Sequence, residues 1–232
     1  MIRNPAFIIL AIALIVTALA VLLPGGRQAD SQPKLPWQIE SLADGSVRVF
    51  SLTLGKSTLN DAKQLLSADP TLSLFRSPEG ALAIEAYFQR ASLSGLRADF
   101  IMALDIDQAT AEQMFERGLR ISQLGSGGKK VELSATDNSL ALESIIRNIT
   151  YIPGTDLETE LLLSRFGEPE QRITDTANAE HWLYPAKGLG IIVNPESNEV
   201  FQYLHPADFD QLIQPLLEAQ SKAQAETETQ TQ

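Results

Sequence analysis

The sequence predicts an α+β protein, in which an N-terminal transmembrane helix precedes two related units, each made of a helix and an antiparallel sheet. Three observations support this fold class: a long apolar run near the N-terminus, a segment that recurs later in the chain, and alternating apolar and polar residues after each copy. The composition is 44% hydrophobic and 20% charged, which is typical of a chain that buries a core.

The apolar run covers residues 6–23 (AFIILAIALIVTALAVLL), where Thr17 is the only polar side chain. A helix of about 18 residues rises roughly 27 Å, close to the roughly 30 Å hydrocarbon core of a bilayer. Two alternatives are a cleaved signal peptide, with an A-x-A site at Ala18 to Ala20, and a buried helix. We favour an uncleaved signal-anchor, because the run continues through Leu23, where a cleavage region is normally polar.

The charges beside the run do not settle its orientation, since Arg3 flanks one end and Arg27 and Lys34 flank the other. We expect the short N-terminal head to stay in the cytoplasm and the large C-terminal portion to be exported. The prediction is a single pass through the inner membrane, with the soluble part in the periplasm if the source is a Gram-negative bacterium.

Composition excludes several function classes. The net charge of −11 disfavours nucleic acid as a partner, because duplex binding needs Lys and Arg to neutralise phosphates. It also disfavours attachment to anionic lipid through the soluble surface. The chain has no cysteine, which excludes disulfides, thiolate metal sites, a cysteine nucleophile and a lipidated N-terminal cysteine.

The domain organisation follows from these composition shifts and from the repeat. We expect an anchor (1–24), a linker rich in Gly and Pro (25–36), a first α+β repeat (37–118), a connecting segment (119–145), a second α+β repeat (146–218) and a disordered tail (219–232).

The repeat is clearest in one nine-residue segment. Residues 47–55 (VRVFSLTLG) align without a gap on residues 146–154 (IRNITYIPG), with Arg and Gly at the same offsets. Each segment alternates like a strand and then breaks at a glycine. A helix should follow each one, with Ser57 as the N-cap of the first and Asp156 as the N-cap of the second.

Three glycines are expected at structural turns: Gly55, Gly154 and Gly167. Gly167 should end the second helix, because Pro169 follows it closely. If Gly154 has a positive φ, Gly154→Val should strain the strand-to-helix turn.

Further elements follow in each copy. The expected strands are 82–89 and 96–104 in the first and 181–184, 189–193 and 199–204 in the second. Closing helices are expected at 108–117 and 208–217. The connecting segment should hold a strand at 130–133 and a short helix near 137–144.

The second copy contains Gly154-Thr155-Asp156, then Arg165-Phe166-Gly167-Glu168-Pro169, then Trp182-Leu183-Tyr184. This pattern resembles the small outer-membrane assembly lipoproteins of the SmpA/OmlA type and the wider fold group of β-lactamase inhibitor proteins. The first copy keeps a weaker version and has Tyr87-Phe88 where the aromatic strand belongs. The resemblance implies a non-enzymatic module that binds proteins or envelope components. The family's lipidated cysteine is missing, so the helix would replace it as the tether.

The sequence offers no strong catalytic or metal motif. Its only histidines, His181 and His205, lie on separate predicted strands without acidic residues at a ligand spacing. The Asp105-Ile106-Asp107 string is interpreted as a strand end and a helix cap. The Gly-rich string at 125–130 lacks P-loop spacing and is interpreted as a hairpin or a linker. We therefore predict no cofactor and no metal, and no catalytic residue is assigned.

Three aromatic residues are the candidate interaction residues: Tyr87, Trp182 and Tyr184. Tyr and Trp often anchor interfaces, because each combines a large apolar body with a polar tip. The alternative is that they fill the seam between helix and sheet, which we favour for Trp182. Trp182 and Tyr184 should share one strand face, because side chains alternate along a strand.

The leading hypothesis is a membrane-anchored envelope protein whose duplicated module binds another protein as an accessory or scaffold. One alternative is an envelope enzyme acting on peptidoglycan or glycan, with its site between the repeats. Another is a binding module for a lipid or small molecule in that same place. Whether the protein is an enzyme stays open, with a non-enzymatic role favoured.

Overall fold

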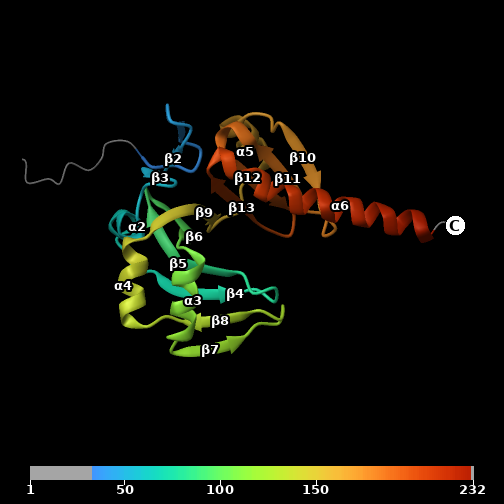
Figure 1. Cartoon of the computed structure of the whole chain (residues 1–232). Helices are drawn as coiled ribbons and strands as arrows, with labels where there is room; N and C mark the ends of the chain where they lie inside the picture. Colours follow the sequence, from blue (N-terminus) through green and yellow to red (C-terminus); the bar gives the residue numbers. More distant parts are fainter. Residues whose placement is uncertain (1–32, 231–232) are drawn as a thin grey trace, which may run out of the picture. The chain divides into compact units, whose positions relative to one another are not determined.

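The structure is a computed structural model that describes the backbone from residue 33 to residue 230 and the side chains up to residue 221. Residues Lys34–Gln232 form one compact unit. The elements are shown in Figure 1, and in chain order they are β1 (Ile39–Ser41), β2 (Val47–Val49), β3 (Leu52–Thr53), α2 (Leu59–Leu66), β4 (Thr71–Arg76), β5 (Leu82–Leu93), β6 (Leu96–Asp105), α3 (Gln108–Glu116), β7 (Arg120–Gln123), β8 (Lys129–Glu132), α4 (Ala135–Glu143), β9 (Ile145–Pro153), α5 (Thr159–Phe166), β10 (Gln171–Thr174), β11 (Glu180–Tyr184), η1 (Pro185–Lys187), β12 (Leu189–Asn194), β13 (Ser197–Leu204), η2 (Pro206–Asp208) and α6 (Asp210–Gln230).

The predicted α+β class is confirmed. One antiparallel sheet of ten strands has the order β10-β11-β12-β13-β9-β6-β5-β4-β8-β7, and β1, β2 and β3 form a small second sheet. We call strands β4–β8 the first half of the large sheet and strands β10–β13 the second half. Strand β9 lies between them and pairs with β13 on one side and β6 on the other.

Helices α2, α3, α4 and α5 all pack on one face of this sheet. Their apolar side chains join one continuous core cluster, which includes Leu59 of α2, Met114 of α3, Ala141 of α4 and Phe166 of α5. Helix α6 packs instead on the opposite face, at the outer strands of the second half, through Leu212 and its neighbours against Ile173 and Leu183. We call the face that carries α6 the far face.

Most predicted strands and helices of the two units are present: β5, β6, β11, β12, β13 and α3 lie at the expected places. The sequence analysis missed β1, β4, β7 and β10. The Gly-rich string at 125–130 forms the turn of the β7–β8 hairpin and the first two residues of β8, and Leu124 donates its N–H to the carbonyl of Gly128 across the turn. Asp107 is the N-cap of α3, as predicted.

The two expected helix caps are each wrong by one or two residues. Helix α2 is capped by Thr58 and not by Ser57, because Thr58 and Asp61 form a reciprocal capping box. Ser57 instead accepts a hydrogen bond from the N–H of Thr53. Helix α5 is capped by Glu158 rather than Asp156, and the Glu158 side chain makes no cap hydrogen bond. Gly167 ends α5 with a φ of 80°, as predicted.

Gly55 and Gly154 are each needed for a different structural reason. Gly55 has a φ of 76°, a conformation that favours glycine. Gly154 is not among the described residues with positive φ, so strain from a left-handed conformation does not apply there. Its N–H donates to the carbonyl of Arg97, and a Cβ on Gly154 would lie 2.9 Å from that oxygen. Close backbone approach is therefore the reason for this glycine.

The two aligned nine-residue segments have different structures. Residues 146–154 form most of one long strand, β9. Residues 47–55 instead fold into the β2–β3 hairpin, because Phe50 and Ser51 both have positive φ, 54° and 67°, in a two-residue turn. The prediction of one strand in the first segment is wrong, since alternation does not reveal a turn built by Phe and Ser.

Because of the hairpin turn, the Phe50 side chain lies in the core. The Phe50 ring lies 5.4 Å from that of Phe100 on β6, 5.2 Å from that of Tyr151 on β9 and 5.6 Å from that of Tyr203 on β13. These three strands are adjacent where the two halves meet. Tyr203 also donates its hydroxyl to the carbonyl of Pro36. The N-terminal part of the described chain thus joins both halves.

The C-terminal segment was expected to lose its structure from residue 219. Helix α6 continues instead through Gln230. The segment QSKAQAETETQ contains several good helix formers, and it extends a helix that is already anchored by packing. Within the described residues, no helix has both the length and the apolar character needed to cross a membrane. The anchor expected at residues 6–23 lies outside the described residues.

Candidate functional site

The far face of the sheet is the candidate functional surface. Its side chains follow from the strand registers, because residues that pair directly across strands lie on the same face. One row crosses β4, β5, β6, β9 and β13 and contains Thr71, Tyr87, Ile101, Thr150 and Gln202. A parallel row contains Ser73, Glu85, Ala103, Asn148 and Leu204.

This face combines polar and apolar side chains that are mostly half-buried. Ile101, Ile152 and Val200 are partly exposed on it, and Tyr87 lies beside Ile101 across the β5–β6 pair. Among the described elements, helices α2, α3, α4 and α5 pack on the opposite face of the sheet. Helix α6 packs on the far face, but only over the outer strands of the second half. The far face of β4, β5, β6 and β9 is therefore a strand surface without a described helix packed over it.

Tyr87 is the predicted interaction residue that lies on this face. Its hydroxyl donates a 2.8 Å hydrogen bond to Asp99, which raises the pKa of Tyr87. The other carboxylate oxygen of Asp99 accepts a 2.6 Å hydrogen bond from the backbone N–H of Arg90, in the bulged part of β5. The hydrogen bond to Asp99 thus fixes the orientation of the Tyr87 side chain, and the residue is partly exposed.

The other two predicted interaction residues lie in the core. Trp182 is 1% exposed and Tyr184 is 2% exposed, and both lie on the face that α5 covers. The prediction that Trp182 faces the core is confirmed. Trp182 donates to Glu180, and the guanidinium of Arg172 lies 4.5 Å from its ring centre. A partner that docks on the surface of this structure does not reach these two side chains.

Tyr184 links strand β11 to the end of α5. Its hydroxyl donates a 2.8 Å hydrogen bond to the carbonyl of Gly167, and its ring packs against Phe166. Burial raises the pKa of Tyr184 to about 12, so the phenol stays neutral at physiological pH. Tyr184, which belongs to the family-like Trp182-Leu183-Tyr184 motif, therefore has a structural role here. It fixes the position of Gly167, the glycine that ends α5.

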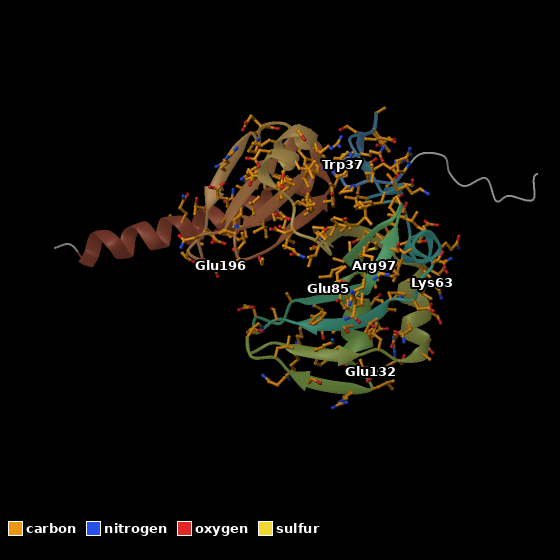
Figure 2. The ribbon with its side chains drawn as sticks, turned by 180° about the vertical axis from the view of Figure 1, so that it is seen from behind. Trp37, Lys63, Glu85, Arg97, Glu132 and Glu196 are labelled. Carbon is orange, nitrogen blue, oxygen red and sulfur yellow. The ribbon has the colours of Figure 1, made fainter. Side chains whose placement is uncertain are left out.

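A polar cavity of about 350 Å³ lies on the far face where the two halves meet. Its lining residues are Glu85, Ala103, Asn148, Ile149, Thr150, Gln202, Tyr203, Leu204 and, from the first turn of α6, Gln211 and Leu212. Figure 2 shows Glu85 on the first half where it faces the second half. Burial raises the pKa of the Glu85 carboxyl, and the positive charge of Lys130 opposes this effect. The sequence analysis did not identify these residues as a site.

Larger concavities lie elsewhere. One of about 680 Å³ is bordered by Lys63, Arg120 and Glu132, and one of about 640 Å³ by Trp37, Leu96 and Arg97. Figure 2 labels Lys63 and Glu132 in the first, and Trp37 and Arg97 in the second. The first also borders strands β4, β7 and β8, and its Lys63 forms a 2.6 Å ion pair with Asp69.

A third concavity, of about 530 Å³, contains the most buried carboxyl group in the second half. Glu199 is 2% exposed and accepts a 3.0 Å hydrogen bond from the N–H of Leu157. Burial raises the pKa of Glu199, and the neighbouring Asp156 raises it further. Asp156, expected as a helix cap, is thus one of two adjacent carboxyl groups.

This arrangement predicts a pH-dependent stability. Because the pKa of Glu199 is higher in the folded than in the unfolded protein, its ionisation destabilises the fold as pH rises above about 4.5. Glu199→Gln should raise the melting temperature (Tm) at about pH 7.5 and have little effect near pH 4. The amide can still accept from Leu157 and can donate to Asp156. Thermal unfolding of both proteins across this pH range checks the prediction.

Glu196→Gln is the matched control, because Glu196 is exposed in the β12–β13 turn. It should shift Tm equally little at both pH values. If Glu199→Gln is less stable than wild type at about pH 7.5, the ionised Glu199 carboxylate stabilises the folded protein. That result would contradict the prediction.

Metal binding has no support in this part of the molecule. Among the described residues, no group of three His, Cys, Asp or Glu side chains is placed to hold a metal ion. His181 lies 3.1 Å from Asp175, and the Nδ1 of His205 accepts from the N–H of Ala207 at the start of η2. The two histidines therefore have separate local partners.

Comparisons of the chain with family models, with curated proteins and with solved structures found no match.

Proposed function

We propose that this protein is a membrane-anchored envelope protein whose α+β module binds another protein as an accessory or scaffold. The observation that carries the proposal is the far face of β4, β5, β6 and β9, where side chains of mixed character lie half-buried without a helix over them. Tyr87 and Ile101 supply an aromatic and an aliphatic contact at its centre. Such a patch, set among polar residues, is typical of protein interfaces.

The membrane anchor at residues 6–23 and a periplasmic soluble part remain elements of this proposal. Their support is the length of the apolar run, which matches a bilayer. A tethered module with an oriented binding face fits a scaffold, because the tether raises the local concentration of the module beside membrane partners.

We also propose that the module arose by duplication and is related to the SmpA/OmlA-type group. A helix, a meander of strands and a second helix follow one another twice, as α2–β4–β5–β6–α3 and as α5–β10–β11–β12–β13–α6. The second copy places its family-like Phe166, Trp182 and Tyr184 in one core. The copies differ in strand number and in the face that the closing helix covers, since α3 joins the main core and α6 packs on the far face.

Site-specific photo-crosslinking in cells tests the protein-binding proposal. A photoreactive residue at Ile101, on the far face, should give a reproducible crosslink to one envelope protein. The same residue at Gln64, exposed on the outer side of α2, is the control and should not give that product. Equal products from both positions, or no protein crosslinked from Ile101 or from Tyr87, would contradict a partner on the far face.

A further inference from the structure

Four polar side chains that line the cavity between the halves make no hydrogen bond to other protein groups within the described residues. Glu85, Asn148, Thr150 and Gln202 come from β5, β9 and β13 and converge on it. Within the described residues, the side chains of these four make no hydrogen bond to protein, whereas the nearby Gln211 accepts from Arg147 and donates to Asp208. These four side chains are only partly buried, so their polar atoms are available to hydrogen-bond a molecule in the cavity.

The chemistry of the lining restricts that ligand. Each amide supplies two N–H donors and a carbonyl acceptor, the Thr150 hydroxyl both donates and accepts, and the Glu85 carboxylate accepts. The lining residues include no Lys or Arg, which disfavours a phosphate or a carboxylate ligand. A single carboxylate, near the positive charge of Lys130, is weak recognition for a polyamine. Ala103, Leu204 and Leu212 form only a small apolar wall for a lipid chain, because Ile149 and Tyr203, which also border the cavity, are fully buried.

We propose that this cavity binds a neutral polyhydroxylated ligand, one or two sugar rings of a glycan, between the two halves of the sheet. Neighbouring sugar hydroxyls both donate and accept, which matches the paired donors and acceptors of Asn148 and Gln202. The volume of about 350 Å³ lies at the small end of ligand cavities, roughly 300–1,000 Å³. The site goes beyond the protein-binding proposal and stands on separate residues.

The central strands make this site rigid. Asn148 and Thr150 lie on β9, which is paired on both sides, and Gln202 is directly opposite Thr150. The backbone of these strands is held by the sheet, so the ligand orders only side chains on binding. Preorganisation of this kind lowers the entropic cost of association.

The test uses the full-length, ¹⁵N-labelled protein in detergent micelles, titrated with N,N′-diacetylchitobiose, cellobiose and maltose. Side-chain amide resonances of Asn148 and Gln202 are followed by NMR. At least one disaccharide should shift them saturably, with a Kd of about 1 mM or tighter. Gln202→Met, which keeps the length of the side chain and removes its amide, should weaken that Kd about tenfold.

Two further variants keep the proposal falsifiable. Gln171→Met, at an exposed position on β10 that does not line the cavity, should leave the Kd unchanged. Thr150→Val replaces the hydroxyl by a methyl group at a position where Val is a good strand former, and it should weaken binding several-fold. Absence of saturable shifts with all three sugars, or equal Kd values for wild type and Gln202→Met, would overturn the proposal. Neither result bears on crosslinking from Ile101, so the two proposals fail separately.

Discussion

Gly188→Ala is expected to lower the free energy of unfolding by about 3 kcal/mol, from roughly 1–2 kcal/mol for the left-handed backbone and roughly 1–3 kcal/mol for overpacking. Gly188 follows η1 with a φ of 58°. A Cβ there would lie well inside 3.0 Å of the carbonyl oxygen of Leu204. That carbonyl belongs to a strand end whose N–H donates back to the carbonyl of Gly188, so it has little freedom to move.

Chemical denaturation of the full-length protein, followed by the fluorescence of Trp37 and Trp182, measures this loss. Gly55→Ala is the matched control, because Gly55 also has a positive φ but has no atom within 4 Å of the added Cβ. It should cost only about 1–2 kcal/mol. Equal losses for the two variants would show that the close approach to Leu204 contributes nothing.

Phe50→Ala is expected to cost about 3–5 kcal/mol, the usual range for deleting a buried aromatic side chain. Phe50 is 2% exposed, and its ring contacts rings from both sides of the junction between the halves. Alanine keeps the unfavourable positive φ of the hairpin turn, so the change removes packing without relieving backbone strain. The loss should also weaken the contact between the N-terminal segment and the sheet.

The control is Phe75→Ala on the far face, where the ring is half-buried and lies 5.8 Å from the ammonium group of Lys130. About 1 kcal/mol is expected there. Hydrogen exchange provides a second measurement, because Phe50→Ala should speed exchange in β9, whereas Phe75→Ala should not. A Phe50→Ala protein that unfolds like Phe75→Ala would show that the aromatic junction does not stabilise the fold.

Local patterns were enough to predict many elements. Strands β5 and β6 lie where runs rich in apolar and aromatic residues predict them, and the Gly167 stop of α5 follows from a glycine and a nearby proline. The same reasoning failed at the β2–β3 hairpin, where Phe50 and Ser51 occupy positions that usually need Asn or Gly. Packing of the Phe50 ring in the core stabilises that turn, and packing is not visible in a local pattern.

The candidate site could not be predicted in the same way. Trp182 and Tyr184 had the residue types of an interface, but α5 covers their face and they fill the core. The cavity residues Glu85, Asn148 and Gln202 are ordinary polar residues in three separate strands. They become a site only because β9 pairs with both β6 and β13, which places them side by side.

The sequence by itself determined the α+β class, many of the strands, the Asp107 cap of α3 and the Gly167 end of α5, because these depend on residues within a few positions of one another. It also contains the apolar run at residues 6–23. Only the tertiary structure decided that both halves share one ten-stranded sheet, that α6 packs on the opposite face from the other helices, and that four polar side chains from three strands meet in one cavity. Those features depend on strand pairings between distant residues, and each pairing is chosen by the packing of the whole core.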